Sequence, residues 1–69
     1  MLKYIITKQG EIIIGNVGHF ELSRVVHESD IISAGRLRFK NGKLETYDKS
    51  YTFDIDSREE DADIIKNNL

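Results

Sequence analysis

The dipeptide Asn41-Gly42 is the feature that most constrains how this chain can fold. Both residue types tolerate positive φ, which a two-residue type I′ hairpin turn requires at its two central positions. Apolar and basic residues alternate before the turn, so we predict one strand at Ile31–Lys40 and a returning strand at Lys43–Tyr47. The turn also fixes the register of these two strands, which pairs Phe39 with Leu44, Arg38 with Glu45, Leu37 with Thr46 and Arg36 with Tyr47.

This register predicts chemically matched pairs across the hairpin. Phe39 and Leu44 form an apolar pair, while Arg38 faces Glu45 with opposite charge. Arg36 faces Tyr47, which suits a contact between a cation and an aromatic ring. All of these pairs are favourable in the same register, so we expect this hairpin to form.

A second hairpin is predicted at the N-terminus. The run Lys3–Thr7 is rich in β-branched residues, Lys8-Gln9-Gly10 is a turn signal, and Glu11–Ile14 is a second apolar run. Its uninterrupted isoleucines indicate a strand covered on both faces, either by the rest of the domain or by another subunit. The apolar residues in 16–30 recur with neither the helical nor the strand period, so we expect a loop with either a short helical turn or an irregular strand.

The C-terminal third predicts one more strand and a helix. Apolar and polar residues alternate over Tyr51–Asp56, as in a half-buried strand. Ser57 followed by Glu60 is a capping box, which predicts a helix over Arg58–Asn67. A helix of about three turns is not stable alone in water, so it must dock on the sheet. The side chains available for docking share one face, namely Ala62, Ile65 and Leu69.

These elements predict an α+β fold in a single domain, residues 1–69, built as a small antiparallel β-meander or partly closed barrel of about five strands with one C-terminal helix. A chain of 69 residues buries only a small core. It has no cysteine for a disulfide and no Cys/His cluster for a structural metal. We therefore expect a homo-oligomer, because self-association is the remaining common source of stability.

Composition and motifs exclude several classes of function. Ten basic and twelve acidic residues give a net charge of −2, which disfavours direct nucleic-acid binding. No apolar run is long enough for a signal peptide or membrane span, so we expect a cytoplasmic protein. His19 and His27 lack a convergent set of metal ligands, and no catalytic or cofactor motif occurs. We expect no enzyme, no metal and no cofactor.

The small residues Ser33-Ala34-Gly35 interrupt a predicted core strand and leave two interpretations open. Either a bulge, the helix or another strand packs closely there, or a ligand approaches the backbone. Arg36 comes next and could pair with an anion. His19 is either an ordinary loop histidine or a ligand contact delivered by a glycine-flanked loop. Ser57 and Arg58 at the helix start are either an anion site or a cap whose arginine pairs with a neighbouring acid.

Four segments, "GEIII", "GHFEL", "IISAG" and "DSREEDADII", together resemble a group of short, mostly uncharacterised proteins from gut bacteria and their phages. The shared pattern is a first hairpin with an E-I-I-I strand, a histidine-containing segment, an S-A-G strand and a closing S-R-x-x-D helix. It covers nearly the whole chain. The sequence departs from the pattern at Asp48-Lys49-Ser50-Tyr51, where a glycine is expected.

The resemblance implies a small anti-defence protein that sequesters a nucleotide-like immune signal as a homo-oligomer, without catalysis. The implied pocket, shared between subunits, comprises His19, Ser33, Ala34, Gly35, Arg36, Ser57 and Arg58. A first alternative is an inhibitor, like an anti-CRISPR protein, that binds a host defence protein through the acidic residues Glu59, Glu60 and Asp63. A second alternative is a structural accessory protein whose sheet edges assemble.

Overall fold

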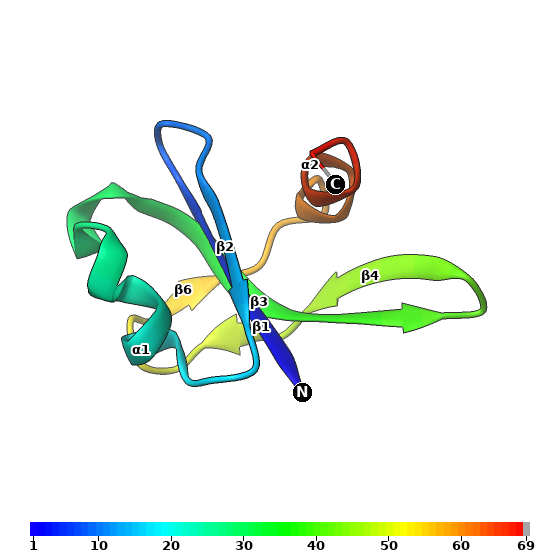
Figure 1. Cartoon of the computed structure of the whole chain (residues 1–69), viewed down its shortest axis with the longest axis horizontal. Coiled ribbons are helices and arrows are strands. Elements are labelled where there is room, and N and C mark those ends of the chain that lie inside the picture. The colour runs from blue at the N-terminus through cyan, green and yellow to red at the C-terminus, as the bar shows by residue number, and fades with distance from the viewer. Residues whose placement is uncertain (69) are drawn as a thin grey trace.

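A four-stranded antiparallel sheet forms the centre of the computed structural model, which describes residues 1–68 of the chain (Figure 1). The strands follow one another in the order β2-β1-β3-β4. A small second sheet pairs β5 with β6. The strand bounds are Leu2–Thr7 for β1, Ile12–Gly15 for β2, Ile31–Lys40 for β3, Lys43–Tyr47 for β4, Lys49–Ser50 for β5 and Ile55–Asp56 for β6.

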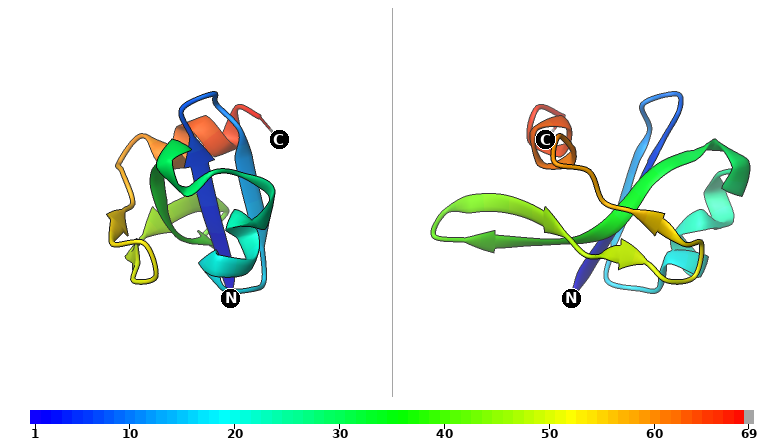
Figure 2. Two further views of the ribbon diagram at one scale, coloured as in Figure 1. Left: turned by 90° about the vertical axis from the view of Figure 1, so that its left-hand side faces the viewer. Right: turned by 180° about the vertical axis from the view of Figure 1, so that it is seen from behind.

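Short helices cover both faces of this sheet (Figure 2). Residues 16–30, where the sequence left a helical turn or a strand open, contain helix α1 and two 3₁₀ turns. Helix α2 closes the chain after β6. The bounds are His19–Leu22 for α1, Ser23–Val25 for η1, Glu28–Asp30 for η2 and Asp61–Lys66 for α2.

The α+β class predicted from the sequence is confirmed, but the strands do not follow chain order. β1 lies inside the sheet, because β3 returns to pair with it instead of with β2. Tyr4, Ile5 and Ile6 of β1 are all buried, so this strand needs a neighbour on each side and cover on each face. The connection through residues 16–30 is long enough to bring β3 back past β2.

Alternate side chains of β1 belong to two separate apolar clusters, one on each face of the sheet. Tyr4 and Ile6 pack with Leu37 of β3 and Ile65 of α2. Ile5 points to the other face, where its cluster also contains Leu22 of α1, Ile31 and Ala34. Helices α1 and α2 therefore lie on opposite faces. Leu69, expected to help α2 dock, lies outside the described residues.

The β3–β4 hairpin has the predicted register over its whole length. Asn41 and Gly42 have φ values of 53° and 78°, as a type I′ turn requires. The Arg38 Nε atom lies 3.0 Å from Glu45 Oε1. The predicted aromatic contact of Arg36 is wrong, because Arg38 lies over the Tyr47 ring, 4.5 Å from its centroid. The hairpin projects as an arm, and α2 lies beside its base (Figure 1).

The predicted strand Tyr51–Asp56 is mostly a turn, and only Ile55–Asp56 is extended. Asp54 adopts a φ of 55°, which breaks the strand. The Lys49 ammonium holds the Asp54 carboxylate at 2.5 Å. The Phe53 N–H donates to the Ser50 hydroxyl across the turn at 3.3 Å. These local polar contacts compete successfully with the alternating pattern.

Replacing Gly42 by Val should destabilise the hairpin by about 1–3 kcal/mol, because a β-branched residue is strained at positive φ. No neighbour lies within 4 Å of a Cβ added at Gly42, so the cost comes from the backbone and not from a clash. Gly42→Asn is the matched control, since asparagine tolerates this conformation and should cost much less. Urea denaturation followed by circular dichroism measures both. Equal stability of the two variants would contradict the assigned turn.

Candidate functional site

A buried carboxylate, Asp61, joins α2 to the sheet. Its side chain is 0% exposed and accepts four hydrogen bonds. The Tyr4 hydroxyl of β1 donates at 2.5 Å, and the Ser33 hydroxyl of β3 donates at 3.0 Å. Arg58 donates twice, from its backbone N–H at 2.8 Å and from Nε at 2.9 Å. Each donor comes from the protein itself, so this site is filled and closed.

The same contacts correct the predicted start of the C-terminal helix. The helix begins at Asp61, three residues later than the capping box implied. The Ser57 hydroxyl does not cap it, because it donates to the Asp48 carbonyl at 2.6 Å. The Asp61 carboxylate instead receives the N–H of Arg58. Of the two interpretations of Arg58, pairing with a neighbouring acid is the one observed.

The small residues of β3 allow protein groups to approach closely. A Cβ added at Gly35 would lie 2.7 Å from the Tyr47 carbonyl oxygen and 2.9 Å from the Ser57 Cβ, so only glycine fits. Ser33 bonds to Asp61 on this face, and Ala34 packs in the cluster on the opposite face. Of the two interpretations of this stretch, the close packing of another strand and of the segment before α2 is therefore observed.

His19 is buried against the same strand, with 4% of its surface exposed. Its Nε2 lies 2.9 Å from the Gly35 carbonyl oxygen. A carbonyl only accepts, so Nε2 carries the proton. Burial lowers the pKa of His19 below its ordinary value, and it outweighs the opposing effect of the Gly35 hydrogen bond. His19 therefore anchors α1 to β3 as a neutral ring.

Tyr4 is the other perturbed group in this region. Burial is the main cause that raises the pKa of its hydroxyl, and the hydrogen bond to Asp61 acts in the same direction. The hydroxyl therefore stays protonated and donates to the carboxylate. This role of Tyr4 is not predictable from the sequence, because an isolated tyrosine in an apolar strand indicates only a core residue.

The structure thus brings the sequence-predicted site residues together, but largely as contacts within the protein. Gly35 lies between His19 and Ser57, and Ser33 reaches Arg58 through Asp61. Arg36 pairs with Asp48, with Nε 3.4 Å from Oδ2, and the Asp48 carbonyl in turn accepts the Ser57 hydroxyl. A ligand at these residues would have to displace groups that already satisfy one another.

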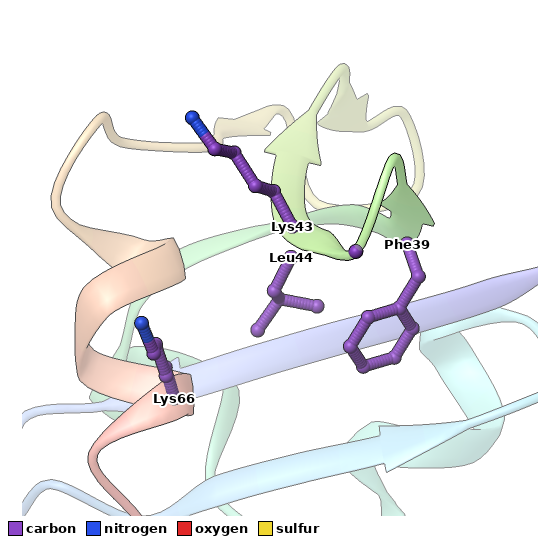
Figure 3. Close-up of a pocket in the computed structure, with 5 residues that line it drawn as sticks. Phe39, Lys43, Leu44 and Lys66 are labelled. Carbon is purple, nitrogen blue, oxygen red and sulfur yellow. The ribbon is translucent and has the colours of Figure 1, made fainter.

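A surface groove between α2 and the tip of the β3–β4 hairpin is open to a ligand. Its volume is about 220 Å³. Phe39 and Leu44 point to the same side of the hairpin, Lys66 extends from α2, and Lys43 stands on the rim, directed away from Leu44 (Figure 3). Phe39 is 66% exposed, although it is a large apolar ring. The groove therefore combines an uncovered aromatic surface with the ammonium group of Lys66, while the Lys43 ammonium lies on the other face of the hairpin.

The positive charge around this groove has no acidic partner within residues 1–68. Lys40 and Lys43 lie directly opposite each other in the hairpin. Like charges in this position repel. None of the ion pairs in the described chain includes Lys40, Lys43 or Lys66. The Lys40 and Lys43 side chains lie on the face of the hairpin opposite to Phe39 and Leu44, so of the three lysines Lys66 is the one beside the apolar groove.

An acidic hollow lies at the other end of α2. It is wide and open, with a volume of about 490 Å³, and it is lined by Glu59, Glu60 and Asp63. All three side chains are exposed. They take no part in the ion pairs of residues 1–68. Helix α2 thus separates an acidic surface from the basic groove.

Comparison with known proteins gives no relative for this chain. No family model matches it, and neither a curated protein nor a solved structure is significantly similar. Within the described residues no group of three or more His, Asp or Glu side chains could hold a metal ion. No helix in that part of the chain is long and apolar enough to span a membrane.

We predict that Asp61→Asn destabilises the protein by about 2–4 kcal/mol, because an amide cannot accept all four hydrogen bonds and leaves a buried donor unpaired. Tyr4→Phe removes one of the four and should cost about 1 kcal/mol. Asp63→Asn, on the exposed side of the same helix, is the matched control and should change stability by less than about 0.5 kcal/mol. Urea unfolding measures all three. If Asp61→Asn behaves like the control, Asp61 does not hold α2.

The lowered pKa of His19 predicts that the protein loses stability as the pH falls from 7.5 to 5.5. The unfolded chain binds a proton below pH 6.5, the ordinary value, while the buried ring resists protonation. Stability from His19 is therefore present above that pH and is lost as the pH falls through the folded-state value. His19→Gln should flatten the pH profile of the melting temperature. His27→Gln, which changes an exposed ring, should keep the slope, and equal slopes for both variants would contradict the prediction.

Proposed function

We propose that this protein binds a small nucleotide-like ligand in the groove between α2 and the β3–β4 hairpin and holds it without converting it. The observation that carries the proposal is the exposed Phe39 ring in a groove that also contains Lys66, whose charge has no acidic partner in residues 1–68. An aromatic ring can stack on a base, and flexible ammonium groups can pair with phosphate.

The size of the groove favours a small ligand. Its volume of about 220 Å³ is below the usual range for drug-sized ligands, so one base with its phosphate fits better than a polynucleotide. The net charge of −2 also disfavours a long nucleic acid, which requires an extended positive surface. The ligand is therefore best described as a mononucleotide or a short cyclic or linear oligonucleotide with one unit bound.

Binding without conversion agrees with the state of the ionisable groups. His19 Nε2 is engaged with the Gly35 carbonyl, and the Asp61 carboxylate is fully hydrogen-bonded and buried. Neither group faces the groove residues, so neither is placed for proton transfer to a ligand there. Sequestration in a host cytoplasm, as part of an anti-defence role, is the context that the resemblance implies for such binding.

A second candidate function is supported by the acidic hollow. Glu59, Glu60 and Asp63 are exposed and lie outside the ion pairs of the described chain, so they could attract a basic protein surface. This arrangement favours the inhibitor alternative, in which the chain blocks a host defence protein. The two candidates use different ends of α2 and can be tested separately.

We expect mononucleotides and cyclic dinucleotides to raise the melting temperature, and nucleosides without phosphate to have no effect. Lys66→Ala and Phe39→Ala should each weaken nucleotide binding roughly fivefold, and the loss should be smaller at high salt for the lysine variant. Lys8→Ala removes an exposed lysine at the opposite hairpin and is the matched control. Calorimetric titration gives the affinities, and chromatography of the ligand after denaturation shows whether it is intact.

Recovery of a converted ligand would make the protein an enzyme and would contradict sequestration. The proposal also fails if no nucleotide binds. Capture of a host defence protein by the wild type, and its loss when Glu59, Glu60 and Asp63 are replaced by their amides, would then favour the inhibitor function.

A further inference from the structure

The outer edge of β2 is free and apolar. β2 is the first strand of the sheet, and within residues 1–68 it pairs with β1 alone. Ile14 is 37% exposed, and Ile12 and Ile13 are only half-buried. The strand Ile12–Gly15 contains neither a proline nor a charged residue, the two kinds of residue that commonly protect a sheet edge from pairing. The domain alone therefore leaves this strand incompletely covered.

The pairing with β1 determines which backbone groups point outward. The Thr7 N–H donates to the Glu11 carbonyl, so Thr7 and Glu11 form a hydrogen-bonded pair. Hydrogen-bonded and non-hydrogen-bonded pairs alternate along antiparallel strands. Ile13, opposite Ile5, therefore directs its backbone groups toward β1. Ile12 and Ile14 direct their N–H and C=O groups to the free edge, and the described residues offer them no other hydrogen-bond partner.

We propose that two copies of this chain join through antiparallel pairing of β2 with β2 about a twofold axis at Ile13. In this register Ile12 of one copy faces Ile14 of the other, and the two Ile13 residues face each other. All four outward N–H and C=O groups of each strand are then paired, giving four hydrogen bonds between the copies. Registers centred on Ile12 or Ile14 would pair residues of the Gly10 turn or the Asn16 bend, so they satisfy fewer strand groups.

Charge also favours this arrangement. Glu11, the charged residue nearest to the strand, would face Gly15 of the other copy, so no like charges are opposed. The other sheet edge, β4, carries Lys43 and Glu45, and Thr46 donates to the Arg58 carbonyl. Charged side chains discourage edge pairing there. Both copies use the same surface, so the interface is isologous and the assembly stops at a dimer. The dimer has one continuous eight-stranded sheet.

Sedimentation velocity of the wild-type protein at micromolar concentrations should give twice the monomer mass of 8.0 kDa. Hydrogen exchange tests the interface without mutation. The Ile12 and Ile14 amides should become more protected as the protein concentration rises, while the Ile13 amide is protected at every concentration by its bond to β1. A monomer throughout the concentration range, or a dimer in which the Ile12 and Ile14 amides do not gain protection, would overturn the proposal.

Cross-linking tests the register, because the chain has no cysteine of its own. Two Ile13→Cys residues would face each other as a non-hydrogen-bonded pair, with Cα atoms about 4.5 Å apart, which suits a disulfide. Ile14→Cys is the matched control, since its two copies would be offset beyond the roughly 7 Å limit. Under mild oxidation Ile13→Cys should form a covalent dimer and Ile14→Cys should stay monomeric on a non-reducing gel. Equal cross-linking of both, or of neither, would contradict the register. Nucleotide binding is not involved in either measurement, so the dimer and the proposed ligand site stand or fall separately.

Discussion

The hydrogen bonds to the buried Asp61 carboxylate are the interaction on which the rest of the structure depends. They join α2 to β1 through Tyr4, to β3 through Ser33 and to the preceding segment through Arg58. A buried charge is costly unless it is fully paired, so these groups must all be in place together. The apolar cluster around Ile65 forms only when α2 is held against the sheet. Both surfaces beside α2, the basic groove and the acidic hollow, also depend on this attachment.

Close packing around β3 explains why a small protein gives up side-chain volume in its central strands. Gly35 admits the Tyr47 carbonyl and the Ser57 side chain, and Ser33 supplies a hydroxyl to the carboxylate. His19 completes the arrangement by bonding to the Gly35 carbonyl from α1. A polar network and tight backbone contacts thus supplement a core that is limited by chain length. The residues with the most distinctive chemistry hold the elements together, whereas Phe39 on the hairpin arm and Ile14 at the sheet edge stay exposed.

The candidate site could be predicted only in part. Composition and spacing singled out His19, Gly35 and Arg58 as ligand contacts, but these residues make contacts within the protein and are not among those that line the groove. The sequence does not show what those residues contact, because the same side-chain donors can bind an acceptor within the protein or a ligand. The groove at Phe39 and Lys66 was missed altogether. Its walls come from a hairpin tip and a helix far apart in the chain, and nothing in either segment signals the other.

The sequence by itself determined the two hairpins, and it fixed the β3–β4 register through Asn41-Gly42, because a type I′ turn depends on the backbone preferences of adjacent residues alone. Only the tertiary structure decided that β1 is central and that β2 is a free edge, since strand order depends on which apolar faces find cover from distant segments. It also decided where α2 begins. Local rules favoured Ser57 as the helix cap. In the structure, however, the Ser57 hydroxyl donates to the Asp48 carbonyl, and the Arg58 N–H donates to the Asp61 side chain. Local preference yields where a distant partner satisfies a buried polar group better.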